Sequence, residues 1–497
     1  MTDRDSHADT HWTAIEQAAR PALAELFDAA PDRLEKLTVE EAGLYFDFSK
    51  THLDDVLVDA FVALAESRDL AGRRDALFAG EIVNVSEGRA ADHPAQRGSG
   101  NPDAVALARG LHARMRSLVD AIESGALGDI RHILHIGIGG SALGPKLLIE
   151  ALGGSDSAYD VAVVSNVDGE ALAGPFELFD PAHTLIAIAS KSFTTGETML
   201  NAESALQWMR EDGVADPFGQ CVALTANPDA ALDFGIDETR ILPFPESIGG
   251  RYSLWSSIGF PAALALGWEA FERLLEGAAA MDRHFRLADW RGNAPVLAAF
   301  ADLYYSQARR AESRAVFAYD ERLRLLPDYL QQLVTESNGK PGDRPTSAIL
   351  WGGVGTDAQH SVFQLLHQGT HLVPVEFIAV AEAGDALDPA HHEALLVNCF
   401  AQGAALMAGR ANDDPARAFA GDRPSTTILL EQLDPATLGA LIAFYEHRTF
   451  AEAMLLGINP FDQFGVELGK EIARGIAEDA ETLDLDPSTA ALIERAL

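Results

Sequence analysis

The stretch RHILHIGIGGSALGPKLLIEAL, residues 131–152, decides the fold class of this chain of 497 residues. A short apolar run ends at Gly137, a glycine-rich turn follows, and apolar residues then recur at helical spacing. A strand, a tight turn and a helix in this order are typical of parallel sheets covered by helices. Backbone N–H groups at the start of such a helix attract anions, and Ser141 adds a hydroxyl donor. The stretch therefore predicts an α/β fold with a candidate phosphate site beyond one strand.

The same glycine turn permits two other interpretations. Gly137, Gly139 and Ala142 fit the G-x-G-x-x-A pattern of dinucleotide-binding folds. Such folds usually carry an acidic residue at the end of the next strand, whereas Asp168 comes three residues beyond Ser165. A P-loop is excluded because no Gly-Lys-Ser/Thr follows the turn. Phosphate binding, dinucleotide binding and plain tight packing all stay open for the turn taken alone.

Outward from this stretch, short apolar runs alternate with helix-like segments along most of the chain. Further strands are expected at 161–166, 184–190, 221–225, 315–320, 347–353, 371–380 and 426–433. This alternation of strands and helices predicts two α/β domains, each a mainly parallel sheet flanked by helices, with helical N- and C-terminal extensions. The expected divisions are 1–103, 104–265, 266–460 and 461–497. Since ligands of open α/β sheets bind beyond the carboxyl ends of strands, chemistry is expected just after 137, 190, 225, 320 and 353.

Composition limits the classes of partner. Thirty-seven basic residues against 75 acidic ones give a net charge of −38, which would repel nucleic acid. No apolar run approaches the ~20 residues needed to span a bilayer, and the N-terminus has no apolar signal core. Two cysteines, Cys221 and Cys399, are too few for a disulfide framework. We expect an acidic globular protein of the cytoplasm.

Lysine is rare, since six of the 37 basic residues are Lys and the rest are Arg. Four of the six lie in or beside segments rich in Gly, Ser, Thr or Asn: Lys146, Lys191, Lys340 and Lys470. Surface charge is the ordinary explanation of a lysine. The clustering instead favours sites where a compact ammonium faces phosphate or sugar oxygens.

The segment ASKSFTTGETM (189–199) strengthens the phosphate hypothesis. Five polar residues share six positions directly after an expected strand: Ser190, Lys191, Ser192, Thr194 and Thr195. Several hydroxyls and one ammonium at a strand-to-helix turn suit a phosphoryl group contacted from many sides. A Ser/Thr helix cap would account for one of these hydroxyls, but not for all five residues.

Two further segments suggest proton-transfer chemistry. Arg251 follows two glycines and could stabilise a developing oxyanion, or it could stack on Tyr252 or Trp255. Glu336 lies near the end of an expected helix that Gly339 would cap. It is either a general base or an ordinary solvated helix residue.

One histidine is a candidate acid or base. His360, at the start of another expected helix, could serve in acid/base chemistry or in structure. No HExxH, CxxC or carboxylate triad with metal spacing occurs, so the sequence supports no metal site.

Taken together, seven blocks of the chain resemble the phosphoglucose isomerase family. They follow the family's order: GIGGSALGP (137–145), VSNVDG (164–169), SKSFTTGETM (190–199), GGRYSLWSSIG (249–259), ESNGK (336–340), GTDAQHSVFQLLHQGT (355–370) and FDQFGVELGK (461–470), with VNVSEGR (83–89) upstream. The resemblance implies two sugar-isomerase-type domains and the interconversion of D-glucose 6-phosphate and D-fructose 6-phosphate in glycolysis and gluconeogenesis, through ring opening and a cis-enediol(ate). It implies no cofactor and no metal.

The resemblance also assigns roles residue by residue. Glu336 becomes the base that moves a proton between C1 and C2, and Arg251 stabilises the enediolate. His360 opens the sugar ring, and Lys470 lies near the ring oxygen. The implied substrate-binding positions are Gly139, Gly140, Ser141, Ser190, Lys191, Ser192, Thr195, Gln332, Gln463 and Glu197, the last as the acidic partner of His360. The family works as a homodimer in which the neighbouring subunit supplies His360.

The chain departs from the family pattern in several places. Ser192 stands where Thr is usual and retains the hydroxyl, Gly196 replaces a Gln, and Phe464 replaces a Trp. The segment after SEGR, AADHPAQR (90–97), and the segment WGGVGTDA (351–358) also differ from the usual pattern. Two alternatives to the isomerase remain, a non-catalytic sugar-phosphate sensor and an NAD-dependent oxidoreductase. The combination of Glu336, Arg251 and His360 favours the isomerase.

Overall fold

The computed structural model describes residues 3–154, 157–479 and 484–497. The chain divides into two compact units, Met1–Pro460 and Phe461–Leu497. Within the described ranges, no helix combines the length and apolar character needed to cross a membrane. Both cysteines, Cys221 and Cys399, are free and buried.

The first sheet has five parallel strands in the order β4-β3-β5-β6-β7. These strands are β3 (His132–Gly137), β4 (Asp160–Val164), β5 (Thr184–Ala189), β6 (Cys221–Thr225) and β7 (Ile241–Pro243). Four of them confirm strands expected from apolar runs, and only the three-residue β7 was not anticipated. The helices of this region are α7 (Pro102–Glu123), α8 (Leu143–Leu152), α9 (Glu170–Leu178), α10 (Gly196–Glu211), α11 (Pro228–Phe234) and α12 (Phe260–Leu266).

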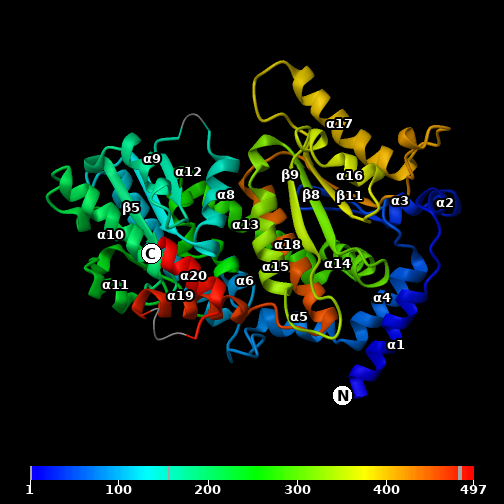
Figure 1. The fold of residues 1–497 in the computed structure, drawn as a ribbon, viewed down its shortest axis with the longest axis horizontal. Coiled ribbons are helices and arrows are strands. Elements are labelled where there is room, and N and C mark those ends of the chain that lie inside the picture. Colours follow the sequence, from blue (N-terminus) through cyan, green and yellow to red (C-terminus); the bar gives the residue numbers. More distant parts are fainter. Residues whose placement is uncertain (1–2, 155–156, 480–483) are drawn as a thin grey trace. The chain divides into compact units, whose positions relative to one another are not determined.

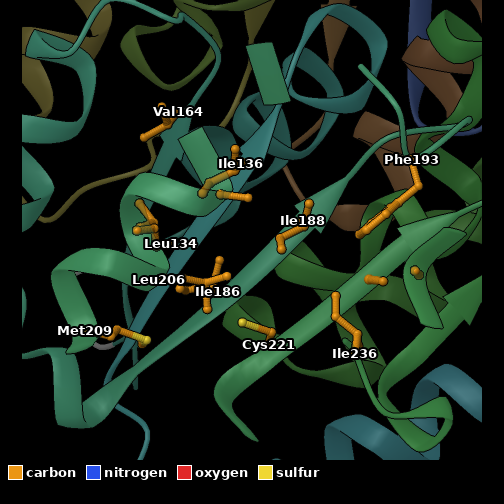
Figure 2. Packing of buried hydrophobic residues seen from close by; sticks show 14 of the residues in the cluster. Leu134, Ile136, Val164, Ile186, Ile188, Phe193, Leu206, Met209, Cys221 and Ile236 are labelled. Carbon is orange, nitrogen blue, oxygen red and sulfur yellow. The ribbon is translucent and has the colours of Figure 1, made fainter. Parts of the chain in front are cut away.

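Side chains from the strands and from α10 form the core on one face of this sheet. Figure 2 shows Ile136 and Ile186, from neighbouring strands, beside Leu206 and Met209 of α10. All four side chains are buried. Both faces of a parallel sheet are normally covered, which explains why β5 is apolar at nearly every position.

The second sheet has six strands in the order β1-β2-β11-β10-β8-β9. Its parallel strands are β8 (Ser313–Tyr319), β9 (Ile349–Val354), β10 (Val375–Val380) and β11 (Ser425–Leu430). These confirm the expected strands of the second half of the chain, and with the first sheet they confirm the predicted α/β class. Figure 1 shows this sheet flanked by α15 (Leu326–Asn338), α16 (Phe363–Gln368) and α17 (Pro389–Ala408).

The N-terminal segment is less helical than expected. Its helices are α1 (Asp3–Gln17), α2 (Leu23–Ala29), α3 (Arg33–Lys36), α4 (Asp55–Ser67), α5 (Leu70–Ala79) and α6 (His93–Gln96). Between them, β1 (Thr38–Glu41) and β2 (Leu44–Asp47) form an antiparallel hairpin that adds to β11. Ala42 and Gly43, both with positive φ, make its turn. Four-residue strands are too short to show a period, so the sequence pattern missed them.

The buried helix α18 (Pro435–Leu456) packs against α13 (Trp268–Leu287), α14 (Ala294–Leu303) and α15. Its contact with α13 is a close backbone approach. A Cβ on Gly439 would lie 2.1 Å from the Leu274 carbonyl oxygen, and one on Gly277 would lie 1.8 Å from the Ala436 carbonyl oxygen. Glycine on both helices is therefore what lets the two backbones touch.

Charged side chains on α18 are buried, and they are paired. Arg97, fully buried, forms ion pairs with Asp282 and with Glu446 of α18, and Glu446 also accepts from Trp255 Nε1 at 2.8 Å. Burial raises the pKa of Glu446, although Arg97 acts in the opposite direction. Removing one member of such a cluster leaves an uncompensated buried charge, so the cluster fixes how α18 meets its neighbours.

Substituting Gly439 tests the close approach of α13 and α18. The variant Gly439→Ala should lose about 2 kcal/mol or more of unfolding free energy, because the backbones must separate. Gly110→Ala is the matched control, since Gly110 lies within α7 and its added Cβ would meet open space. The control should be neutral or gain up to about 1 kcal/mol. Urea unfolding midpoints measure both, and equal midpoints would contradict the packing described.

Candidate active site

The glycine turn after β3 packs tightly against two other parts of the chain. The turn forms a 3₁₀ segment, η1 (Gly139–Ser141), and Gly139 has φ of +58°. A Cβ on Gly140 would lie 2.2 Å from the Gly250 carbonyl carbon, and one on Gly139 would lie 2.9 Å from Gln332 Nε2. A side chain at Gly140 would clash with backbone, and one at Gly139 would be strained by the positive φ, so the turn closely approaches both the arginine loop and the helix of Glu336.

His135, on β3, supports this turn from beneath. Its Nε2 lies 2.7 Å from the Ser141 carbonyl oxygen, and the side chain is fully buried. Burial lowers the pKa of His135 to about 4, so the ring is neutral near pH 7. Because a carbonyl oxygen only accepts, we assign the proton to Nε2. Sequence reasoning did not single out this residue, because a histidine within an apolar strand has no distinctive pattern.

The second polar loop follows β5, at the neighbouring carboxyl end of the same sheet. Ser190 Oγ lies 3.0 Å from Thr195 Oγ1 and accepts from the Phe193 N–H at 3.1 Å. Ser192 Oγ accepts from Thr194 Oγ1 at 2.8 Å. The loop therefore holds its own hydroxyls in place, and Ser192 is exposed at its surface.

Lys191 of this loop contacts backbone oxygens. Its Nζ donates to the Glu246 carbonyl at 2.7 Å and to the Ile248 carbonyl at 3.1 Å. Burial, followed by the charge of Arg89, lowers the pKa of Lys191. The ammonium thus ties the loop to the segment that leads into Gly249 and Arg251, a contact that sequence reasoning did not anticipate.

Arg251 lies in the 3₁₀ segment η5 (Gly250–Trp255), and its side chain is 1% exposed. Its Nη1 donates to Glu336 Oε1 at 3.1 Å, its Nε to Ser337 Oγ at 2.6 Å, and its Nη2 to the Pro460 carbonyl. The guanidinium carbon also lies 5.5 Å from the centre of the Tyr252 ring. The sequence left two interpretations of Arg251, stacking on an aromatic ring and stabilisation of an oxyanion. Because one guanidinium contacts both the Tyr252 ring and the Glu336 carboxylate, the two interpretations are compatible.

Glu336 lies in the last turn of α15, which ends at Asn338 with Gly339 as its cap, as predicted. Its side chain is 24% exposed, so one face of the carboxylate remains open. Gln332, one turn earlier, donates from Nε2 to Glu336 Oε2 at 2.8 Å. One carboxylate oxygen thus accepts from Arg251 and the other from Gln332, which fixes the orientation of the group.

Two residues beside Glu336 anchor this end of the helix from its buried side. Ser337 Oγ lies 2.9 Å from Tyr252 Oη, in addition to its bond with Arg251. Asn338 Nδ2 donates to Glu452 Oε2 of α18 at 3.1 Å. Sequence reasoning did not select either residue, although both lie inside the ESNGK block.

His360 and Glu197 occupy other parts of the first unit. His360 is exposed in the 3₁₀ segment η9 (Ala358–His360), which follows β9. Glu197 is exposed in the first turn of α10. Ser141, Ser190, Ser192 and Thr195 follow strands of the first sheet, whereas His360 follows a strand of the second.

Gln463 and Lys470 belong to the second compact unit. Although they lie seven residues apart, the two do not share one helix. The helix α19 (Glu467–Asp479) begins after Gln463, and a short 3₁₀ segment, η11 (Phe464–Val466), separates the two. The Gln463 backbone, with φ of −153°, lies outside any helix. Residues 487–496 form the last helix, α20 (Pro487–Ala496).

The arrangement in the first unit suits proton transfer beside a carbonyl. A partly exposed carboxylate, Glu336, is held next to a fixed guanidinium, Arg251, and the glycine turn that carries Ser141 contacts the loop of Arg251 and the helix of Glu336. A base, an oxyanion stabiliser and an anion-binding loop are the groups that such chemistry needs. Among the described residues, no cluster of three or more His, Cys, Asp or Glu could hold a metal ion.

Comparison with known proteins gives consistent results. The family model described as phosphoglucose isomerase matches residues 47–493. Glucose-6-phosphate isomerases of Rhizorhabdus wittichii and Zymomonas mobilis are 68% and 63% identical, over 99% and 98% of this chain and 100% and 98% of their own lengths. A crystal structure of a glucose-6-phosphate isomerase from Chlamydia trachomatis aligns with a TM-score of 0.89 at 31% identity, over 100% of this chain and 99% of that one. This chain belongs to the phosphoglucose isomerase family.

Proposed function

We propose that this chain is an isomerase that interconverts D-glucose 6-phosphate and D-fructose 6-phosphate by proton transfer through a cis-enediolate. One observation carries the proposal: Glu336 Oε1 lies 3.1 Å from Arg251 Nη1, so a base and an oxyanion stabiliser are held side by side. Gly139 lies against the side chain of Gln332, which donates a hydrogen bond to Glu336. The anion-binding turn is therefore one side chain away from the base.

The phosphoryl group is held by the two loops after β3 and β5. The hydroxyls of Ser141, Ser190, Ser192 and Thr195 donate to its oxygens, with the backbone N–H groups of the helix starts of α8 and α10. Lys191 contributes positive charge beside this loop. These contacts are the same before and during the reaction, so they fix the sugar and not the transition state.

The reaction begins with ring opening, for which His360 and Lys470 act as acid and base at the ring oxygens. Glu336 then removes the proton from C2, and the C2–H electron pair forms the enediolate while the C1 carbonyl oxygen becomes negative. Arg251 stabilises this oxygen. Glu336 returns the proton to C1 while the hydroxyl proton of the C2 oxygen passes to the C1 oxygen, so the C2 oxygen becomes the carbonyl of the ketose. Gln332 orients Glu336, and Gln463 contacts the sugar.

We further propose a homodimer of the cytoplasm in which a neighbouring copy supplies His360, with Glu197 as the acidic partner of the imidazole. Residues 104–265 and 266–460 would act as the two domains, with 1–103 and 461–497 as extensions. Family membership supports this assembly, and the parallel strands of one sheet lie within 104–265 and those of the other within 266–460.

Removing the base tests the assignment directly. Glu336→Gln keeps the size of the side chain but cannot accept the C2 proton, so kcat should fall about a thousandfold or more. KM for fructose 6-phosphate should change less than about threefold, since phosphate contacts persist. Conversion of fructose 6-phosphate, coupled to glucose-6-phosphate dehydrogenase, measures both.

Glu203→Gln provides the control, because Glu203 is exposed on α10 and the same charge is removed there. It should match the unmodified enzyme. Turnover of Glu336→Gln near that of the control would show that another group is the base.

Substituting a loop hydroxyl tests the phosphate site. Ser192→Ala should raise KM for fructose 6-phosphate, and the inhibition constant of inorganic phosphate, by about tenfold, because one hydrogen bond to a charged group is lost. The value of kcat should stay within about threefold, since this contact is equal in ground and transition states. Ser204→Ala on α10, whose hydroxyl donates to the Leu200 carbonyl, is the control. An unchanged phosphate inhibition constant in Ser192→Ala would place the phosphate elsewhere.

A further inference from the structure

The guanidinium of Arg251 donates to acceptors of two kinds. One is the Glu336 carboxylate, and the others include the neutral Ser337 hydroxyl and the neutral Pro460 carbonyl. Ser337 is fully buried, and its Oγ lies 2.6 Å from Arg251 Nε, closer than Glu336 Oε1 lies to Nη1. The side chain therefore stays attached to the protein at two points that do not involve the base.

The proposed reaction moves negative charge away from Glu336. When the carboxylate takes the C2 proton it becomes neutral, and the charge it carried appears on the substrate oxygen. A neutral carboxylic acid holds a guanidinium much less strongly than a carboxylate does. If Glu336 alone positioned Arg251, the guanidinium would be released at the moment when the enediolate needs it.

Ser337 is itself held rigidly. Its Oγ accepts from Arg251, so it can donate its own proton to Tyr252 Oη, 2.9 Å away. The Tyr252 ring is buried and stacks on His93, with ring centres 4.6 Å apart and an angle of 28° between the planes. Asn338, the next residue, is fixed to Glu452 of α18. The hydroxyl thus has one position available, and so does the Nε that it binds.

We infer that Ser337 is a positioning residue for the isomerisation: its hydroxyl holds Arg251 in place while negative charge passes from Glu336 to the substrate. The inference rests on the proposed function. Ser337 does not touch the sugar and acts only through Arg251. Its effect therefore belongs to the transition state, in which Arg251 carries the developing charge, and not to substrate binding.

The test compares ligands that resemble different stages of the reaction. In Ser337→Ala, kcat should fall about 30-fold, less than the roughly hundredfold or greater loss expected when an oxyanion donor is removed outright, because Arg251 is still present. KM for fructose 6-phosphate and the inhibition constant of inorganic phosphate should stay within about twofold, because the phosphate loops are intact. A five-carbon phosphosugar hydroxamate, whose planar oxygens imitate the enediolate, should lose affinity by about the same factor as kcat.

Two further variants complete the test. Ser337→Cys fills the position with a slightly larger group that is a weaker hydrogen-bond acceptor, so it covers the case in which the alanine variant does not fold, and its kcat should fall about tenfold. Ser425→Ala removes another buried hydroxyl, one with no hydrogen-bond partner among the described residues, and should leave kcat unchanged.

Unchanged kcat and hydroxamate affinity in the Ser337 variants would overturn the inference. So would a parallel loss of phosphate affinity, because this would indicate general disruption of the site. Failure of the unmodified enzyme to convert fructose 6-phosphate would instead refute the proposed function itself.

Discussion

The candidate site depends on the hydrogen bonds that the guanidinium of Arg251 donates to Glu336, Ser337 and Pro460. This guanidinium joins a loop that follows the first sheet to the end of α15, which belongs to the second half of the chain, and to the Pro460 carbonyl at the end of the first unit. These partners are separated by 85 to 209 residues in the sequence. The proposed base, Glu336, and the proposed oxyanion stabiliser, Arg251, come from different regions of the chain and are thereby held side by side. Preorganisation of this kind costs nothing at the moment of reaction.

The buried helix α18 is the constraint behind that interaction. Its glycine contact with α13 sets the helix position, and its acidic side chains then pair with groups that lead to the site. Glu446 accepts from Trp255, four residues beyond Arg251, and Glu452 accepts from Asn338, two residues beyond Glu336. Both site residues are thus connected, over a few residues of backbone, to the same rigid element. Buried pairs of this kind tolerate little displacement.

Much of the fold could be predicted because parallel strands leave a local signal. The apolar runs that end at Gly137 and Ser190 marked β3 and β5 correctly, and motif residues pointed to Glu336 and Arg251. The hairpin β1–β2 was missed because strands of four residues show no period. The bonds of Lys191 to two carbonyls, and of Ser337 to Arg251, were missed for another reason. A contact between distant segments leaves no trace in local spacing, and Ser is too common a residue to be singled out.

The measurement that tests the central claim most directly is proton exchange during turnover in D₂O, followed by NMR. If a carboxylate carries the proton through an enediolate, the proton on Glu336 exchanges with solvent. Over many turnovers, glucose 6-phosphate formed from fructose 6-phosphate should then carry deuterium at C2. Glucose 6-phosphate that still carries only substrate-derived hydrogen at C2 at equilibrium would mean a direct hydride shift between C1 and C2. That result would contradict the roles of Glu336 as the base and of Arg251 as the oxyanion stabiliser.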